Sequence, residues 1–246
     1  MTEKQRQQQE KREKRLAQER ARVAAMRAFE RETAAGIPDD GLLCGIDEAG
    51  RGPLAGPVSA GAVILPPDHD LLYLNDSKKL SASRRESLYD EITREAVAWA
   101  VVFVSPERID EINILQATYE AMRGAVREVC SQLEARKADM EAQGIPGAAE
   151  APEAPAGLLN DAVRIPGIAI PQFPVVKGDA KCLSIAAASI LAKVTRDRYM
   201  EEMDEKFPMY GFARHKGYGT KEHMEAIRAY GPCPIHRRTF IKGITG

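Results

Sequence analysis

The stretch Leu43–Pro53, LCGIDEAGRGP in one-letter code, is the most informative segment of this chain. It places two adjacent carboxylates, Asp47 and Glu48, at the end of an apolar strand expected over Leu42–Ile46 and directly before a glycine-rich loop. Two ionised carboxylates this close together raise each other's pKa, so the pair is best explained by a cation that neutralises it. The stretch therefore predicts a site where metal ions are held against a phosphate.

Hydrophobic periodicity predicts an α/β fold around this strand. The apolar segment Val58–Leu65 follows the Gly/Pro loop and is expected to form a hairpin with Leu42–Ile46. The other expected elements are a helix at Arg84–Ala96, a buried strand at Val97–Val104, an amphipathic helix through Ile112–Leu133, strand-like pieces at Leu158–Asp161 and Phe173–Asp179, and a helix at Ser184–Phe207. Small residues early in the last helix would let it approach a sheet closely.

One core with extra pieces is expected from a length of 246 residues and an apolar fraction of 44%. Residues 1–38 form a charged N-terminal extension, helical or disordered, to which we assign no catalytic role. Residues 39–246 form the main domain. Within it, residues 136–157 are rich in Ala, Glu, Pro and Gly. Such a segment buries too little apolar area to offset the entropy of ordering, so it predicts a low-complexity surface insertion.

Charge and composition exclude several classes of protein. The formal net charge of -1 argues against a strongly basic nucleic-acid coat, although lysine and arginine cluster locally. No segment reaches the roughly 20 apolar residues of a membrane span, and the polar N-terminus lacks a signal core, so we expect a cytoplasmic protein. The four cysteines lack disulfide or zinc spacing and are expected to be reduced, and the four histidines are expected to be structural.

Four acidic residues occupy equivalent places near the ends of expected strands or before a helix: Asp47, Glu48, Asp161 and Asp179. Strand ends often meet at one edge of an α/β sheet, so one site could hold all four. Such oxygen ligands suit Mg²⁺ or Mn²⁺ rather than zinc, and two such ions can activate a water and stabilise the leaving oxygen at phosphorus. Taken singly, Asp179 is more readily explained as a turn or helix-cap residue, and Asp161 could likewise be a turn former at a strand end.

The loop Gly50–Ala55 also fits a relaxed dinucleotide-binding fingerprint. That fingerprint must open a helix, whereas here Pro57 and a strand follow, so a nucleotide-dependent dehydrogenase is a poor alternative. The glycines favour close approach of the backbone to a sugar or phosphate, with charge from Arg51, or else simply form a tight hairpin turn.

Several longer motifs of this chain together resemble the ribonuclease HII family. They are Gly45–Val58, Asp76–Leu80, Gly178-Asp179 followed by Ser184–Asp197, Tyr210–Phe212, His215–Thr220 and His236–Phe240. The resemblance covers nearly everything from Leu42 onward. It implies an RNase H-like fold, with a mixed central sheet flanked by helices and a helical C-terminal portion.

The resemblance also implies an activity, a cofactor and a set of site residues. The expected activity is metal-dependent endonucleolytic cleavage of RNA paired with DNA, and of duplex DNA on the 5′ side of a single embedded ribonucleotide, as in ribonucleotide excision repair. The metal-binding acids would be Asp47, Glu48, Asp161 and Asp179, with Mn²⁺ or Mg²⁺ as cofactor. Gly50, Arg51 and Gly52 would read the 2′-hydroxyl, and Tyr218 would stack on the next deoxyribose.

Further expectations concern the duplex and the partners. Lys78 and Lys79 are expected to contact the substrate, as are Lys181, Lys193 and Arg196, although each is as readily an ordinary solvated charge. We expect a monomer that binds RNA:DNA hybrid and ribonucleotide-containing duplex DNA. A different class of function, a junction-binding protein without cleavage, needs the basic and aromatic residues but not all four acids.

The chain also departs from the family pattern in one place near the site. The third acid commonly precedes a glycine in the family, whereas here Asp161 precedes Ala162. The assignment of Asp161 therefore depends on its strand and on its distance from Asp179.

Overall fold

Five strands form one mixed sheet in the computed structural model, which describes residues 2–69 and 71–244. In spatial order they are β3 (Ala98–Val104), β2 (Val58–Ile64), β1 (Leu43–Ala49), β4 (Gly157–Asp161) and β5 (Gln172–Val175). The pairs β3–β2 and β2–β1 are antiparallel, and β1–β4 and β4–β5 are parallel. The hairpin expected after the glycine-rich loop is therefore confirmed, and β1 is the central strand.

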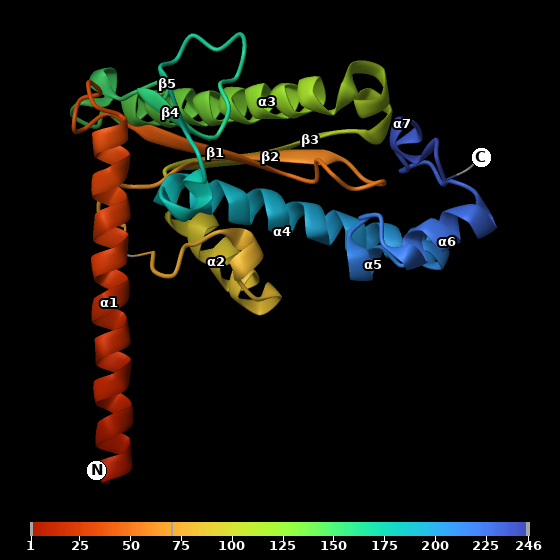
Figure 1. Ribbon diagram of the computed structural model, residues 1–246. Helices are drawn as coiled ribbons and strands as arrows, with labels where there is room; N and C mark the ends of the chain where they lie inside the picture. The colour runs from red at the N-terminus through yellow and green to blue at the C-terminus, as the bar shows by residue number, and fades with distance from the viewer. Residues whose placement is uncertain (1, 70, 245–246) are drawn as a thin grey trace.

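Helices cover both faces of this sheet and extend it at one end (Figure 1). The longer helices are α1 (Glu3–Thr33), α2 (Ala82–Glu95), α3 (Pro106–Ala142), α4 (Leu183–Lys206) and α6 (Lys221–Tyr230). The short helices are η1 (Ser77–Lys79), η2 (Ala148–Glu150), η3 (Gly178–Ala180), η4 (Pro208–Tyr210), α5 (Phe212–His215) and α7 (Arg238–Ile241). Figure 1 shows α3 on one face of the sheet, α4 on the other, and α5 to α7 beyond the far end of α4.

Helix α4 lies directly against the backbone of β1 and β2. A Cβ atom on Gly45 would lie 2.0 Å from the carbonyl carbon of Ser184, and one on Gly61 would lie 2.4 Å from the Ala188 oxygen. Contacts this short are impossible for a real side chain, so only glycine permits this approach. The small residues predicted to bring this helix close to a sheet do so.

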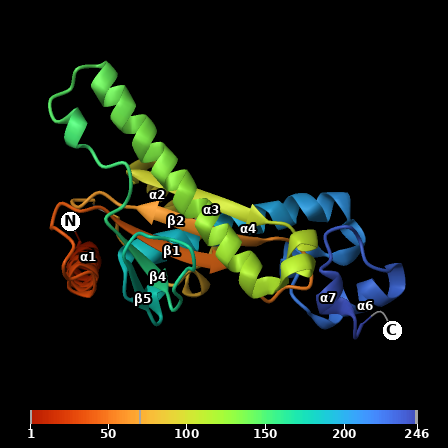
Figure 2. The same ribbon diagram turned by 90° about the horizontal axis from the view of Figure 1, so that it is seen from above.

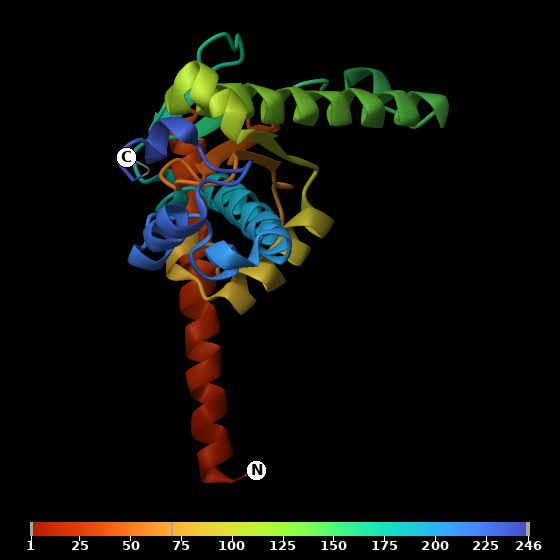
Figure 3. The same cartoon turned by 90° about the vertical axis from the view of Figure 1, so that its right-hand side faces the viewer.

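Helix α3 is interrupted at Asn113, whose φ of 67° lies in the left-handed region. The Asn113 side-chain oxygen accepts hydrogen bonds from the backbone N–H groups of Leu115 and Gln116, at 3.0 and 3.2 Å. Asparagine tolerates this conformation and caps the turn that follows, so the kink has a local cause. Past the kink, α3 runs on to Ala142 and extends beyond the edge of the sheet (Figures 2 and 3).

Several boundaries differ from those expected from the sequence. Strand β1 continues through Asp47 and Glu48 to Ala49, so both acids belong to the strand. The segment 136–157, expected as a surface insertion, begins inside α3 and ends at the first residue of β4. Helix formers such as Ala, Glu and Lys let α3 extend into this segment despite its low apolar content.

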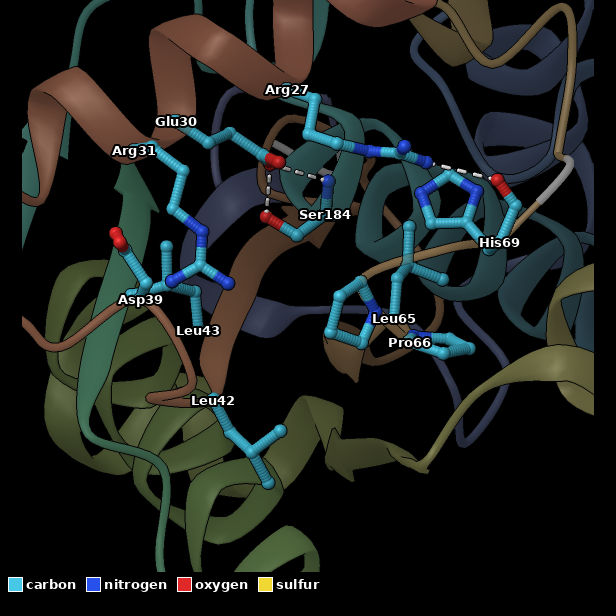
Figure 4. Close-up of a pocket in the computed structure, with 11 residues that line it drawn as sticks. Arg27, Glu30, Arg31, Asp39, Leu42, Leu43, Leu65, Pro66, His69 and Ser184 are labelled. Atoms are coloured by element: carbon cyan, nitrogen blue, oxygen red, sulfur yellow. Dashed lines mark hydrogen bonds between the residues drawn. The ribbon is translucent and has the colours of Figure 1, made fainter.

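The N-terminal segment forms the continuous helix α1, whose first half is exposed and whose second half packs on the domain. Val23 and Met26 join the apolar cluster around α2 and α4, and Phe29 packs near the start of α4. Figure 3 shows the exposed half projecting away from the sheet. The packed half borders a cavity of about 230 Å³ next to the N-terminus of α4 (Figure 4).

Glu30 of α1 supplies the cap that α4 lacks in its own sequence. The residue before α4 is Cys182, which makes no side-chain cap. The Glu30 carboxylate instead accepts hydrogen bonds from the backbone N–H and the hydroxyl of Ser184, at 2.8 and 2.6 Å (Figure 4). A carboxylate at a helix N-terminus is favoured by both the free N–H groups and the helix dipole.

In the part of the chain that the structure describes, no helix is long and apolar enough to cross a membrane. The cysteines are free, as expected; Cys44, Cys182 and Cys233 are buried and Cys130 is half-buried.

Replacing Glu30 by alanine should lower the free energy of unfolding by about 1 to 3 kcal/mol, because two buried donors on Ser184 lose their acceptor. Glu30→Gln keeps a side-chain oxygen at this position and should lose less. Urea denaturation measures the change. Glu32→Ala, an exposed position on the same turn of α1, is the matched control and should cost less than about 0.5 kcal/mol. Equal losses in the Glu30 and Glu32 variants would contradict the capping role.

Candidate active site

Asp47 and Asp161 are neighbours because β1 and β4 run parallel in a fixed register. Ile46 pairs with Asn160, so the next residue of each strand is one of the two acids. Paired residues of parallel strands point to the same face of the sheet, here the face covered by α4. Ser189 of α4 lies beside the Asp47 carboxyl, and both residues line one cavity. Two strands and one helix therefore converge on this pair.

The other two predicted acids lie beside this pair. Glu48 follows Asp47, and its N–H donates to an Asp47 carboxylate oxygen at 2.8 Å. Asp179 is in η3, which is tied to β4 because the Gly178 N–H donates to the Asp161 carboxylate at 2.7 Å. Asp179 and Asp161 interact electrostatically. The parallel strands and η3 thus bring the four acids to one edge of the sheet.

Burial and mutual repulsion both act on these carboxyls. The pKa of Asp47 is raised well above its ordinary value by burial first, and then by the charges of Glu48 and Asp161. Burial also raises the pKa of Glu48. The Arg51 guanidinium, whose Nη1 lies 3.2 Å from Glu48 Oε1, lowers that pKa and partly offsets the effect of burial. Burial, followed by Asp76 and Asp161, raises the pKa of Asp179. The site therefore carries more negative charge than its own residues neutralise.

A cavity of about 380 Å³ opens in front of Asp47 and Glu48. Its lining includes most of the predicted substrate-binding residues, namely Gly50, Arg51, Gly52, Lys78 and Tyr218. Lys79 is not among the lining residues; it is largely exposed and lies 3.8 Å from Asp76. Asp161 and Asp179 also lie outside this lining, on the β4 side of Asp47.

The glycine loop is held from behind by two buried arginines. Arg237 donates to the carbonyl oxygens of Gly50, Arg51 and Gly56, at 2.5, 2.8 and 2.9 Å. Arg196 donates to Ala55, Pro57 and Lys216 in the same way, at 2.9 to 3.0 Å. Burial, with the nearby Arg196 charge, lowers the pKa of Arg237 to about 9.

This arrangement corrects the sequence prediction for Arg196. Its guanidinium is buried and donates its hydrogen bonds to backbone carbonyl oxygens. It therefore holds the loop and does not reach a phosphate. It also explains Gly50, because a Cβ there would lie 2.1 Å from the Arg196 Nε. A positive charge directly behind the loop favours an anion in front of it.

Three residues of the site were not singled out by sequence reasoning. Ser189 and Ser77 line the cavity, and their hydroxyls lie 2.8 Å apart. Asp76 interacts with Asp179. A polar side chain on the apolar early part of α4 was the available signal for Ser189, and the Asp76–Leu80 motif was the signal for the other two.

The donor set suits a hard divalent cation. Carboxylate oxygens are the ligands that Mg²⁺ and Mn²⁺ prefer, and a buried Asp47 next to two other acids needs a counter-charge. Among residues 2–69 and 71–244, no three His, Cys, Asp or Glu side chains converge tightly enough to enclose an ion by themselves.

Comparisons with known proteins identify the family. A family model described as "Ribonuclease HII" matches residues 44–243. The chain belongs to the ribonuclease HII family. A "Ribonuclease HII" from Lachnoclostridium phytofermentans is 52% identical over 236 residues, which cover 96% of this chain and 83% of that protein. Another, from Clostridioides difficile, is 48% identical over 231 residues, covering 93% of this chain and 80% of that protein.

The ribonuclease HII fold is also found in solved structures. The ribonuclease H2 of Pyrococcus horikoshii OT3 is 27% identical with a TM-score of 0.61, covering 82% of this chain and 96% of that one. The ribonuclease HII of Archaeoglobus fulgidus, solved in complex with PCNA, is 26% identical with a TM-score of 0.57, covering 83% and 97%. The predicted RNase H-like fold, family and enzyme class, ribonuclease HII (EC 3.1.26.4), are confirmed.

Ala162, the residue after Asp161, has a φ of 55° in the left-handed region. An L-residue pays about 1 to 2 kcal/mol there that glycine avoids, partly offset by the greater freedom of unfolded glycine.

Ala162→Gly should therefore raise the free energy of unfolding by about 0.5 to 1 kcal/mol, measured by urea denaturation, with cleavage activity retained. Ala151→Gly is the matched control, because Ala151 has an ordinary φ of -62° and should be destabilised slightly. A loss of stability in both variants would show that Ala162 is not strained.

Two histidines, His223 and His236, are fully buried near Tyr218. Burial lowers the pKa of each to about 4, below the unfolded value of 6.5. The unfolded chain then binds more protons between these values, so the contribution to stability is complete above pH 6.5 and is lost as the pH falls toward 4.

Between pH 7 and pH 5 the loss should reach at most about 2 kcal/mol of unfolding free energy for each ring, measured by urea denaturation at each pH. The buried acids act in the opposite direction because their pKa values are raised, so the comparison must be with a His223→Asn/His236→Asn protein. The native protein should lose more stability on acidification than this variant. A parallel decline in the two proteins would contradict the assignment.

Proposed function

We propose that this ribonuclease HII cuts its substrate at the edge formed by Asp47, Glu48, Asp161 and Asp179. The activity of the family is cleavage of RNA in RNA:DNA hybrids and at ribonucleotides embedded in duplex DNA. The observation that supports the placement is the β1–β4 register, which sets Asp161 beside the buried Asp47 that lines the cavity.

The acids would hold the divalent ions on which ribonucleases of this family depend. When bound, such ions supply an activated water and a counter-charge for the departing 3′ oxygen, which gives 3′-hydroxyl and 5′-phosphate ends. Whether Mg²⁺ or Mn²⁺ is preferred depends on site rigidity and ligand count. The chain orients Asp47 through the Glu48 N–H, which donates to its carboxylate at 2.8 Å, and a bound cation would favour the ionised form of this buried group.

Recognition of the ribonucleotide is proposed for the glycine loop and Tyr218. Gly50 and Gly52 leave their backbone open to the cavity, and Arg237 and Arg196 occupy carbonyl groups on the far side of the loop. A ribose 2′-hydroxyl could then approach main-chain groups that a side chain would cover, and this hydroxyl is the group that distinguishes RNA from DNA. The ring of Tyr218, 45% exposed, is free to stack on the neighbouring deoxyribose.

Basic residues around the cavity would meet the phosphate backbone. Lys78 lines the cavity, and Lys79, the next residue along the chain, is largely exposed. Lys193 also lines it, but it is paired with Asp197 at 2.5 Å, and burial lowers its pKa. Lys78 is therefore the better candidate for a direct phosphate contact. A cytoplasmic location and a monomeric state stay predictions.

Asp47→Asn should lower cleavage of a duplex DNA carrying one ribonucleotide by about 10³-fold or more, because the change removes the charge that holds the cation. The assay uses end-labelled duplex with Mg²⁺, with Mn²⁺ and with chelator, and maps the cut to the 5′ side of the ribonucleotide.

The matched control is Asp90→Asn, an exposed aspartate on α2, which should cleave at the native rate. Normal turnover in the folded Asp47→Asn protein would overturn the placement of the site. Tight binding without cleavage in any divalent ion would instead revive the non-catalytic junction binder.

A further inference from the structure

A chain of hydrogen bonds runs through two buried histidines to the backbone of Tyr218. The Cys233 N–H lies 3.0 Å from His236 Nδ1, His236 Nε2 lies 3.0 Å from His223 Nε2, and His223 Nδ1 lies 2.9 Å from the Tyr218 oxygen. His223 is on α6 and His236 precedes α7, so the chain connects two separate segments. The four proposed metal-binding acids, the loop glycines and the lysines that line the cavity take no part in it.

The partners at the two ends decide which nitrogen carries each proton. Because the Cys233 N–H donates, His236 Nδ1 must accept, which places the proton of that ring on Nε2. That proton faces His223 Nε2, which therefore accepts, so His223 carries its proton on Nδ1 and donates it to the Tyr218 oxygen. Every donor has one acceptor when both rings are neutral. We call this chain of hydrogen bonds, from Cys233 through His236 and His223 to Tyr218, the relay, and all of its donors point the same way.

The same segments also bind the glycine loop. The Leu54 N–H donates to the Gly217 oxygen, the Arg237 N–H donates to the Leu54 oxygen, and Ala55 forms a β-bridge with His236. Residues adjacent to Tyr218 and adjacent to the relay are thus hydrogen-bonded to the loop that carries Gly50 and Gly52. The relay closes a ring of contacts between the two proposed recognition elements.

We propose that His223 and His236 are positioning residues that fix Tyr218 relative to the Gly50–Gly52 loop and so set the affinity for the ribonucleotide-to-DNA junction. This inference rests on the proposed function, in which the loop and Tyr218 contact neighbouring nucleotides. The two histidines touch neither the acids nor the cavity, and they act through the backbone of Tyr218.

The side chains packed around His223 and His236 are mostly aromatic and form other contacts. The ring of His215 stacks on His223 at 4.4 Å between centroids, and Phe212 and Tyr210 contact the pair edge-on or tilted. The thiol of Cys233 lies 3.1 Å from His236 Nδ1, and Arg238 is the charged group that acts on the ring of His236. His215 bonds the Tyr210 oxygen and the Gly217 N–H, so its own bonds leave the relay intact.

The experiment is a double-mutant cycle between His223 and Tyr218, read as kcat and KM on a DNA duplex with one ribonucleotide. His223→Ala should raise KM several-fold with a smaller change in kcat, because the acids are untouched. In the Tyr218→Ala background the same substitution should raise KM no further, because there is no ring left to position. His223→Asn retains a donor near the Nδ1 position and should restore most of the affinity.

Ile227→Ala is the matched control, since Ile227 is buried on the same helix, α6, and takes no part in the relay. It lowers stability without changing the relay, so its KM should stay native while the protein is folded. The fraction of folded protein is checked by circular dichroism at the assay temperature, and His223→Asn serves where His223→Ala is unfolded.

The outcomes separate the relay from the proposed function. Equal effects of His223→Ala with and without the Tyr218 ring would reduce the histidines to a structural role. A native KM for folded His223→Ala beside a raised KM for Tyr218→Ala would overturn the relay alone. A native KM for Tyr218→Ala would overturn both the recognition role of Tyr218 and the relay, while lack of cleavage by the native enzyme would refute the proposed function itself.

Discussion

The contact between the α4 backbone and the two glycines of the central strands is the constraint on which the rest of the structure depends. Gly45 and Gly61 let Ser184 and Ala188 reach the sheet at distances that no Cβ allows. This depth places Ser189 at the Asp47 carboxyl and Arg196, further along α4, behind the glycine loop. One close helix–sheet contact therefore supports both halves of the site.

The site separates opposite charges that a folded protein would ordinarily pair. On one side, buried Asp47 lies beside two further acids, and on the other, Arg196 and Arg237 bond only to carbonyl oxygens within the described contacts. Burying a charge without a partner is costly, so each set is stabilised by a different device. The acids suit a cation, and the arginines are satisfied by up to three carbonyl groups each. The result is a surface that offers both cation ligands and a positive field to a phosphodiester.

Helix α1 and the C-terminal helices support this arrangement from outside the sheet. Glu30 caps the N-terminus of α4, and the relay through His223 and His236 reaches the backbone of Tyr218. Glu30, His223 and His236 are not among the residues proposed to bind metal or substrate. The cap and the relay both supply hydrogen bonds to backbone groups that local sequence leaves unsatisfied, which is a general requirement for buried backbone.

The sequence by itself determined the central strand with its adjacent acids, the hairpin, the close-packing helix and the family, because apolar periodicity, glycine and acidic motifs are local signals. It also singled out Gly50–Gly52, Lys78 and Tyr218, which the structure places around one cavity. Only the tertiary structure decided that Arg196 faces carbonyl groups, that Glu30 caps a helix 154 residues away, and that two histidines form a relay. These depend on which backbone groups meet across the fold, and no local pattern encodes that meeting.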